Sequence, residues 1–207
     1  MKHLLSFALS LFWIGNVMAI EEPKYTVVMT DGPGEVRLYA PVLVAETLVE
    51  GDMDQASGKG FRLIADFIFG NNQIAMTAPV SIEPQSAKIA MTAPVMLEPQ
   101  SNAVDFQKAQ QWLVKFVMPS QYTLASIPKP KNSAVTLREL PSKPYVVLTY
   151  SGFNTQSRVQ AKTQEAVQWA LQHHLVLAGV PQLSRYDPPW TLPMFRRNEI
   201  MIEVAAP

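Results

Sequence analysis

An internal duplication is the feature that most restricts how this chain folds. Residues 74–86 and 89–101 agree at all but two of their positions, with Ser81 and Ile82 replaced by Met96 and Leu97. In both copies the larger aliphatic residues alternate with small or polar ones, which predicts two strands that each have one apolar face. A solenoid needs at least about three repeats, so two copies indicate a local hairpin or an insertion.

Each copy also carries a proline in its centre, Pro79 in the first and Pro94 in the second. Proline lacks the amide proton of a ladder hydrogen bond, so each strand must run along a sheet edge, start late or contain a bulge at that point. The duplicated segment therefore marks the place where we expect a sheet or barrel to open.

Composition narrows the class of protein. The chain has 207 residues with 17 basic and 17 acidic side chains, so we expect no nucleic-acid partner. It has no cysteine, which excludes disulfides, thiolate nucleophiles, cysteine-ligated zinc and covalent haem attachment. It also lacks the usual hydrolase elbow, zinc-protease and phosphate-loop motifs, which argues against an enzyme.

The first residues are typical of an export signal. Lys2 and His3 precede an apolar run from Leu4 to Val17, and Val17-Met18-Ala19 places small residues at the positions that a signal peptidase reads. We expect a signal peptide over residues 1–19, cleavage after Ala19 and one domain over residues 20–207. The alternative is an uncleaved anchor, although the run is shorter than the roughly 20 residues of a membrane span. A periplasmic or secreted protein without stable membrane insertion follows.

The rest of the chain predicts an α+β domain built on an antiparallel sheet or barrel. Apolar residues at helical spacing predict helices from Asp52 or Asp54 to about Phe69 and from Gln156 to Leu175. A turn is expected at Asp31–Gly34. The segments that read as strands are 25–30, 35–50, 111–118, 134–140, 145–150, 183–186 and 199–204.

Several motifs, in order, resemble the SOUL haem-binding protein family over residues 25–205. They are Ile-Ala-Met-Thr-Ala-Pro-Val at 74–80 and 89–95, Tyr-Asp-Pro-Pro-Trp-Thr-Leu-Pro at 186–193, Arg-Arg-Asn-Glu-Ile at 196–200, and shorter pieces at 35–39, 116–119 and 127–130. The resemblance implies a distorted antiparallel β-barrel with two flanking helices and pseudo-twofold halves. It also implies haem or another tetrapyrrole, held in a shallow hydrophobic cleft beside the first helix.

Binding a tetrapyrrole needs a flat apolar surface, cations for the propionates and, optionally, an axial ligand. On the first helix an apolar stripe supplies candidate contacts, with a methionine nearby and an aromatic wall in the proline-rich loop: Phe61, Ile64, Ala65, Ile68, Met76 and Trp190. Lys59 and Arg62 are the candidate partners of the propionates. The alternatives are that the apolar residues fill the barrel and that the two cations are ordinary solvated charges.

His173 and His174 remain for axial ligation once His3 is removed. His174 continues the apolar stripe and is the candidate metal ligand, although a histidine at a helix C-terminus is also favoured by the helix dipole alone. Asp66 and Thr191 stand where the vertebrate haem binders of the family are associated with lysines. An acidic Asp66 repels a propionate, so the alternative is a binding module for another amphipathic molecule.

Arg196, Arg197, Asn198 and Glu199 suggest a buried polar network in which a guanidinium pairs with Glu199 or Glu35. A third function, a hydrolase with Glu199 or Glu35 as base, is the least supported. The prediction is therefore an exported protein that holds haem or a related tetrapyrrole non-covalently, for buffering or transport.

Overall fold

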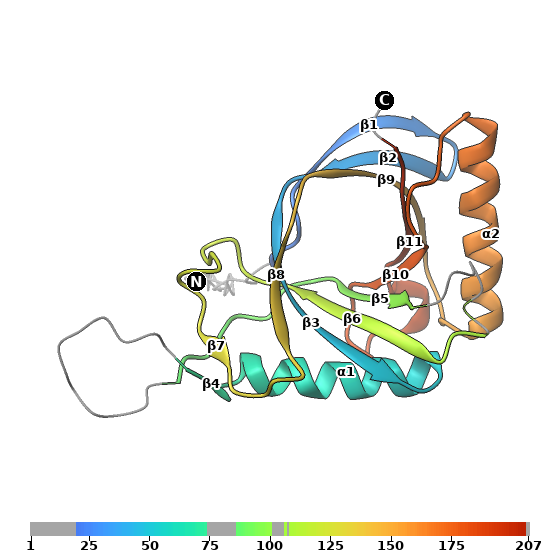
Figure 1. Cartoon of the computed structure of the whole chain (residues 1–207). Helices are drawn as coiled ribbons and strands as arrows, with labels where there is room; N and C mark the ends of the chain where they lie inside the picture. Colours follow the sequence, from blue (N-terminus) through green and yellow to red (C-terminus); the bar gives the residue numbers. More distant parts are fainter. Residues whose placement is uncertain (1–19, 74–85, 101–105, 107, 206–207) are drawn as a thin grey trace, which may run out of the picture.

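A single curled antiparallel sheet dominates the fold. The computed structural model describes residues 20–73, 86–100, 106 and 108–205. Within them a nine-stranded sheet curls into a half-barrel, and two helices lie on its outer side (Figure 1). The prediction of an α+β domain with a distorted antiparallel barrel and two helices is confirmed.

The sheet has the order β1-β2-β9-β11-β10-β5-β6-β3-β8, and every pairing in it is antiparallel. Its strands are β1 (Tyr25–Asp31), β2 (Gly34–Tyr39), β3 (Val42–Glu50), β5 (Val95–Pro99), β6 (Gln111–Val117), β8 (Thr136–Leu140), β9 (Lys143–Tyr150), β10 (Gln182–Arg185) and β11 (Asn198–Glu203). A separate pair joins β4 (Asn72–Gln73) to β7 (Lys129–Pro130). The helices are α1 (Met53–Ile68), α2 (Gln156–Gln172) and the short 3₁₀ helix η1 (Pro193–Phe195).

Two halves of like topology build the sheet. One half runs β3-α1-β5-β6 along the chain and the other runs β9-α2-β10-β11, and in each the last strand lies between the other two. The halves meet where β5 pairs with β10. The strands before each half are exchanged: β2 leads into β3 but pairs with β9, whereas β8 leads into β9 but pairs with β3. This is the pseudo-twofold arrangement that was predicted.

Local chemistry explains the ends of α1. Asp52 caps its first turn, because its side chain accepts a hydrogen bond from the Gln55 amide. Gly70, with a φ of 128°, turns the chain away after the last turn, a conformation that glycine adopts without strain. The buried face of α1 packs on β3 and β6, and Trp112, Phe67 and Phe106 are among the largest buried side chains.

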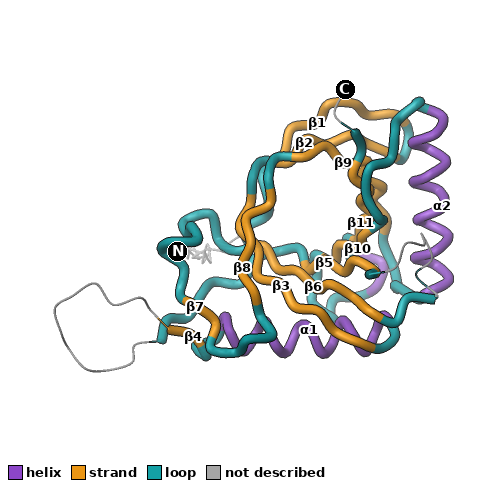
Figure 2. The backbone as a smooth tube through the Cα atoms, in the orientation of Figure 1, coloured by secondary structure: helices purple, strands orange, loops and turns teal. Residues whose placement is uncertain are grey.

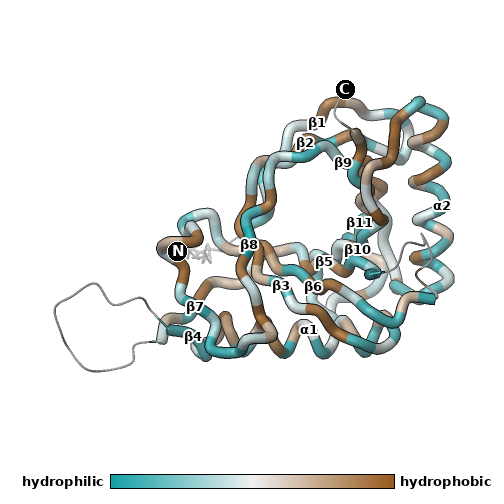
Figure 3. Tube along the Cα trace, viewed as in Figure 1, coloured by the Kyte–Doolittle hydropathy of each residue, from teal (hydrophilic) through white to brown (hydrophobic). Residues whose placement is uncertain are grey.

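Helix α2 ends earlier than predicted. Thr155 caps its start, but its last residue is Gln172 and not Leu175. His174 adopts a left-handed conformation with a φ of 56°, and the Leu175 and His174 amides bond back to Ala170 and Leu171. This is a Schellman-type end, which terminates a helix whatever apolar residues follow. Figure 3 shows hydrophobic and hydrophilic residues alternating along both helices, as one buried face requires.

Two strand predictions need correction. The segment 35–50 is not one strand, because the chain leaves β2 at Ala40-Pro41 and β3 joins a different part of the sheet. In the second repeat copy only β5 is a regular strand; it starts directly after Pro94, the late start that the missing amide proton imposes. The first copy lies outside the described residues, apart from Ser86. Among the described residues, no helix has both the length and the apolar character of a membrane span.

Candidate functional site

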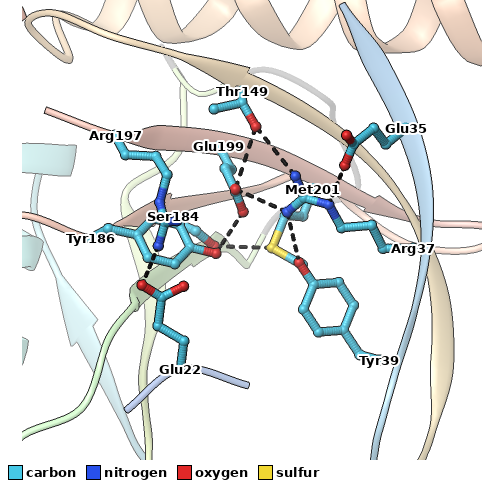
Figure 4. Close-up of polar contacts among 10 residues, drawn as sticks. All are labelled: Glu22, Glu35, Arg37, Tyr39, Thr149, Ser184, Tyr186, Arg197, Glu199 and Met201. Atoms are coloured by element: carbon cyan, nitrogen blue, oxygen red, sulfur yellow. Dashed lines mark hydrogen bonds and ion pairs between the residues drawn. The ribbon is translucent and has the colours of Figure 1, made fainter. Parts of the chain in front are cut away.

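A buried polar network occupies the concave face of the sheet (Figure 4). Arg37 of β2 donates from Nη1 to Glu199 Oε1 of β11 at 2.9 Å and from Nε to Glu35 Oε2 at 2.6 Å. Tyr186 donates its hydroxyl to Glu199 Oε2 at 2.6 Å. Burial lowers the pKa of the Arg37 guanidinium, but the Glu199 carboxylate and the hydrogen bonds to Tyr39 and Glu35 together more than offset this, and the pKa is raised overall. The buried charges of Arg37 and Glu199 therefore compensate each other, and both side chains have further hydrogen-bond partners.

The sequence predicted this network but assigned its guanidinium wrongly. The central cation is Arg37, whereas Arg197 lies at the border of the network and Arg196 bonds elsewhere. Arg197 stacks 3.6 Å above the centre of the Tyr186 ring and pairs with Glu22 at 2.5 Å. Arg196 donates to backbone carbonyls of its own loop. Strand alternation alone does not say which arginine reaches Glu199, because β2 and β11 are joined through β9.

The concave face also contains a small cavity. It holds about 40 Å³ and is lined by residues from most strands of the sheet, among them Tyr39, Met96, Tyr145, Gln182, Tyr186 and Met201. Sites for drug-sized ligands usually occupy about 300–1,000 Å³, whereas about 10–15 Å³ is enough for one water. The cavity has room for small molecules such as water, and a tetrapyrrole does not fit it in this conformation.

A second surface lies outside the barrel along one flank of α1. Arg185 at the end of β10 reaches the first turns of α1, and the Ile89 amide bonds to the Ile68 carbonyl at the other end of the helix. The chain from Ile89 then runs back to Val95, which pairs with Arg185. Phe61 lies on this flank, 40% exposed, with its ring 5.7 Å from that of Phe116.

The loop between β10 and β11 adds an exposed apolar surface that starts directly after Arg185. Four large side chains on it are mostly in solvent: Trp190, Leu192, Met194 and Phe195, with Trp190 81% exposed. Arg196 fixes the loop by donating to the Thr191 and Pro189 carbonyls at 2.7 and 2.5 Å. Several large exposed apolar side chains on one loop make this loop a candidate interaction surface.

The structure separates the predicted contact residues into surface and core. Phe61 and Trp190 are exposed, but Ile64 and Ile68 belong to the hydrophobic core and Ala65 is also buried. Lys59 donates to the Glu50 carbonyl at 3.0 Å, on the opposite flank from Phe61, and Arg62 is exposed. Met76 lies outside the described residues. The direct contribution of these residues to binding stays a prediction.

The histidines lie away from this surface. His174 follows the end of α2 that is farthest from α1 (Figure 1), and it is exposed. His173 packs against Trp169, with ring centres 4.2 Å apart and the ring planes tilted by 43°, and lies 3.2 Å from the Asp31 carboxylate. Across the part of the chain that the structure describes, no three His, Cys, Asp or Glu side chains gather to hold a metal ion. Ligation of iron by His174 stays a prediction.

Fold and surface together define a curled-sheet α+β domain of two like halves, with an apolar outer surface beside its first helix. Residues 20–86 and 82–203 match the family model of the SOUL heme-binding protein, and the chain belongs to this family. No curated protein matches the chain.

Solved structures share the fold at low identity. The C-terminal domain of EcmrR is 13% identical, with 88% of this chain and 99% of that chain covered and a TM-score of 0.57. An uncharacterized conserved protein from Listeria innocua is 12% identical, with coverages of 83% and 92% and a TM-score of 0.55. A structure described as a hydrolase from Listeria innocua is also 12% identical, with coverages of 83% and 91% and a TM-score of 0.52. Figure 2 shows the backbone arrangement to which these likenesses refer.

Proposed function

We propose that the chain binds haem or a related tetrapyrrole non-covalently on the outer surface formed by α1 and the β10–β11 loop. Membership of the SOUL family supports the class of ligand. The observation that carries the location is that Arg185 bonds to Ser57 on α1, one turn before the exposed Phe61, and is followed directly by the loop with exposed apolar side chains. A flat macrocycle buries apolar area there, at about 25 cal/mol per Å².

The size of the concave cavity supports the same choice. At about 40 Å³ it is an order of magnitude below the volume of a typical organic ligand site. The chain contains no cysteine, so haem cannot be attached through thioether bonds, in keeping with the proposed non-covalent binding. With His173 and His174 far from α1, the proposed grip on the macrocycle is mainly apolar contact and charge pairing.

A hydrolase is the weaker alternative, although one protein of this fold is described as one. Of its two candidate bases, Glu35 accepts a hydrogen bond from Arg37 at one carboxylate oxygen. The other, Glu199, is only 2% exposed and accepts hydrogen bonds at both carboxylate oxygens, from Arg37 and from Tyr186. A general base needs a free lone pair within reach of substrate. Glu199 is therefore better suited to holding the sheet together than to abstracting a proton.

The predicted signal peptide supports a further part of the proposal, that the chain acts outside the cytoplasm. A protein that binds reversibly, exported and without covalent chemistry, is suited to buffering or carrying a tetrapyrrole. Cell fractionation of the full chain, with N-terminal sequencing of the product, tests this part of the proposal. An intact N-terminus, or recovery in the cytoplasm, contradicts it.

Titration with ferric haem, followed at the Soret band, tests binding to the chain that begins at Ile20, where the described fold begins. We expect a saturable one-to-one transition. Phe61→Glu and a Trp190→Ala/Phe195→Ala pair should each weaken it at least tenfold, because they remove apolar contact or add a charge. The controls are Leu171→Ala, an exposed apolar residue of α2, and His173→Ala/His174→Ala; both should bind like the unchanged chain.

Circular dichroism shows whether each variant keeps its fold. No saturable transition in the unchanged chain, beyond that of an unrelated control protein, overturns the proposed function. Unchanged affinity in both site variants overturns the proposed location.

A further inference from the structure

Arg185 has a guanidinium that the described protein groups satisfy only in part. It is the last residue of β10 and pairs with Val95 and Asn198. Its Nη1 donates to the Ser57 hydroxyl at 3.1 Å, and its Nη2 lies 3.6 Å from Asp54 Oδ1, which is too long for a good hydrogen bond. Its Nε is buried and has no hydrogen-bond partner among the described residues.

The charge of Arg185 is also poorly compensated. Asp54 is its nearest carboxylate, but the Asp54 side chain is 78% exposed, so water screens the attraction. Burial lowers the pKa of the Arg185 guanidinium, Asp54 offsets this only in part, and the neighbouring Arg196 adds repulsion. A buried donor without an acceptor destabilises the fold, so its presence calls for a partner such as a water, an ion or a ligand.

Arg185 lies where the two parts of the proposed surface meet. Ser57, to which it bonds, is one helical turn before Phe61, and side chains at this spacing are about 5–6 Å apart at Cβ. Tyr186, the next residue, opens the loop that carries Trp190. A ligand resting against Phe61 and the loop therefore has Arg185 at its edge.

We infer that Arg185 binds a carboxylate of the ligand, and that the site thereby selects tetrapyrroles with free propionate groups. This rests on the proposed function. A guanidinium presents a planar fork that matches a carboxylate, and in a partly dry site the pair is stronger than on open surface. Of the two cations predicted for this role, Lys59 lies on the opposite flank of α1 and Arg62 is exposed to solvent.

Comparing haem with its dimethyl ester tests this inference, because the ester keeps the macrocycle and loses both negative charges. The unchanged chain should bind haem at least tenfold more tightly than the ester. Arg185→Gln should remove most of this preference by weakening haem binding and leaving ester binding within about twofold. Arg138→Gln is the matched control, because it removes the same charge from a half-exposed side chain on β8, at the far edge of the sheet, and it should keep the preference.

A second variant acts in the opposite direction and does not depend on the stability of Arg185→Gln. Asp54→Asn removes the carboxylate that competes for Arg185, so haem should bind severalfold more tightly while the ester is unaffected. Equal binding of haem and ester by the unchanged chain, or a preference that survives Arg185→Gln, overturns the inference and leaves the proposed function standing. Saturable binding of neither compound overturns both.

Discussion

Mutation of the Arg37–Glu199 pair should lower the stability of the fold strongly. Both side chains are almost fully buried, at 8% and 2% exposure, so loss of one leaves the other with a buried charge. The variant Glu199→Leu leaves Glu35 as the remaining carboxylate beside Arg37, so the buried positive charge is only partly compensated. We expect a loss of about 3 kcal/mol in the free energy of unfolding. Urea unfolding followed by circular dichroism measures it.

The control for this pair is Lys162→Gln on α2, which breaks the more exposed Lys162–Glu165 contact. It should change the free energy of unfolding by less than about 0.5 kcal/mol. A loss below about 1 kcal/mol for Glu199→Leu would show that Glu35 alone compensates Arg37.

The sequence pattern did not predict which residues of α1 are buried and which are exposed. Phe61 and Ile64 belong to the same apolar stripe of α1, so the pattern gives them equal standing as ligand contacts. The stripe is wide, and its centre packs on the sheet while its border stays at the surface. Ile64 therefore lies in the core and Phe61 is 40% exposed. Nothing in the sequence indicated Arg185. What draws attention to it is a buried Nε without a hydrogen-bond partner among the described residues, and only the structure reveals that.

The two glycines of α1 have opposite roles, which the sequence alone does not distinguish. A Cβ added at Gly60 would lie 2.5 Å from Val114 Cγ2, whereas at Gly58 the nearest atom is Arg62 Nη1 at 3.6 Å. We expect Gly60→Ala to lower the free energy of unfolding by about 1–3 kcal/mol through overpacking. Gly58→Ala should raise it by about 0.5–1 kcal/mol through helix propensity.

Thermal or urea unfolding of the two single variants checks this contrast. The same sign of change in both would mean that the close approach of α1 to β6 does not control its stability. Glycine weakens a helix through its backbone freedom, and the structure gives Gly60 a packing role as well.

At the level of elements, the sequence predicted both long helices and most strands of the large sheet, but not which strands pair with one another. The ends of α1 followed from Asp52 and Gly70, because capping chemistry is local. The split at Ala40-Pro41 did not, because it depends on which distant strands β2 and β3 join. The two family matches overlap at residues 82–86, within the first copy of the repeat, which favours an insertion as the origin of the duplication.

The whole molecule should lose stability at alkaline pH. Burial raises the pKa of Tyr39, Tyr150 and Tyr186, and that of Tyr145 to about 12. An unfolded tyrosine releases its proton near pH 10, so the stabilisation is complete below about pH 10 and is lost as pH rises through the folded pKa. Each tyrosine contributes a slope of up to about 1.4 kcal/mol per pH unit.

Urea unfolding between pH 8 and 11.5, with tyrosinate absorbance recorded in parallel, checks this expectation. Tyr145→Phe removes one titrating group and should flatten the decline above pH 10. A free energy of unfolding that stays constant to pH 11.5 would contradict the burial of these hydroxyls.

The exchange of β2 and β8 between the halves determines how the fold responds to cleavage of the backbone. Each half needs a strand from the other to complete its side of the sheet. A protease that nicks the exposed connection near Ser133, between β7 and β8, therefore separates the two halves in sequence but not in space. The pairings of β2 with β9 and of β8 with β3 still join the two fragments after the cut. The nicked protein therefore keeps its fold until both fragments unfold together.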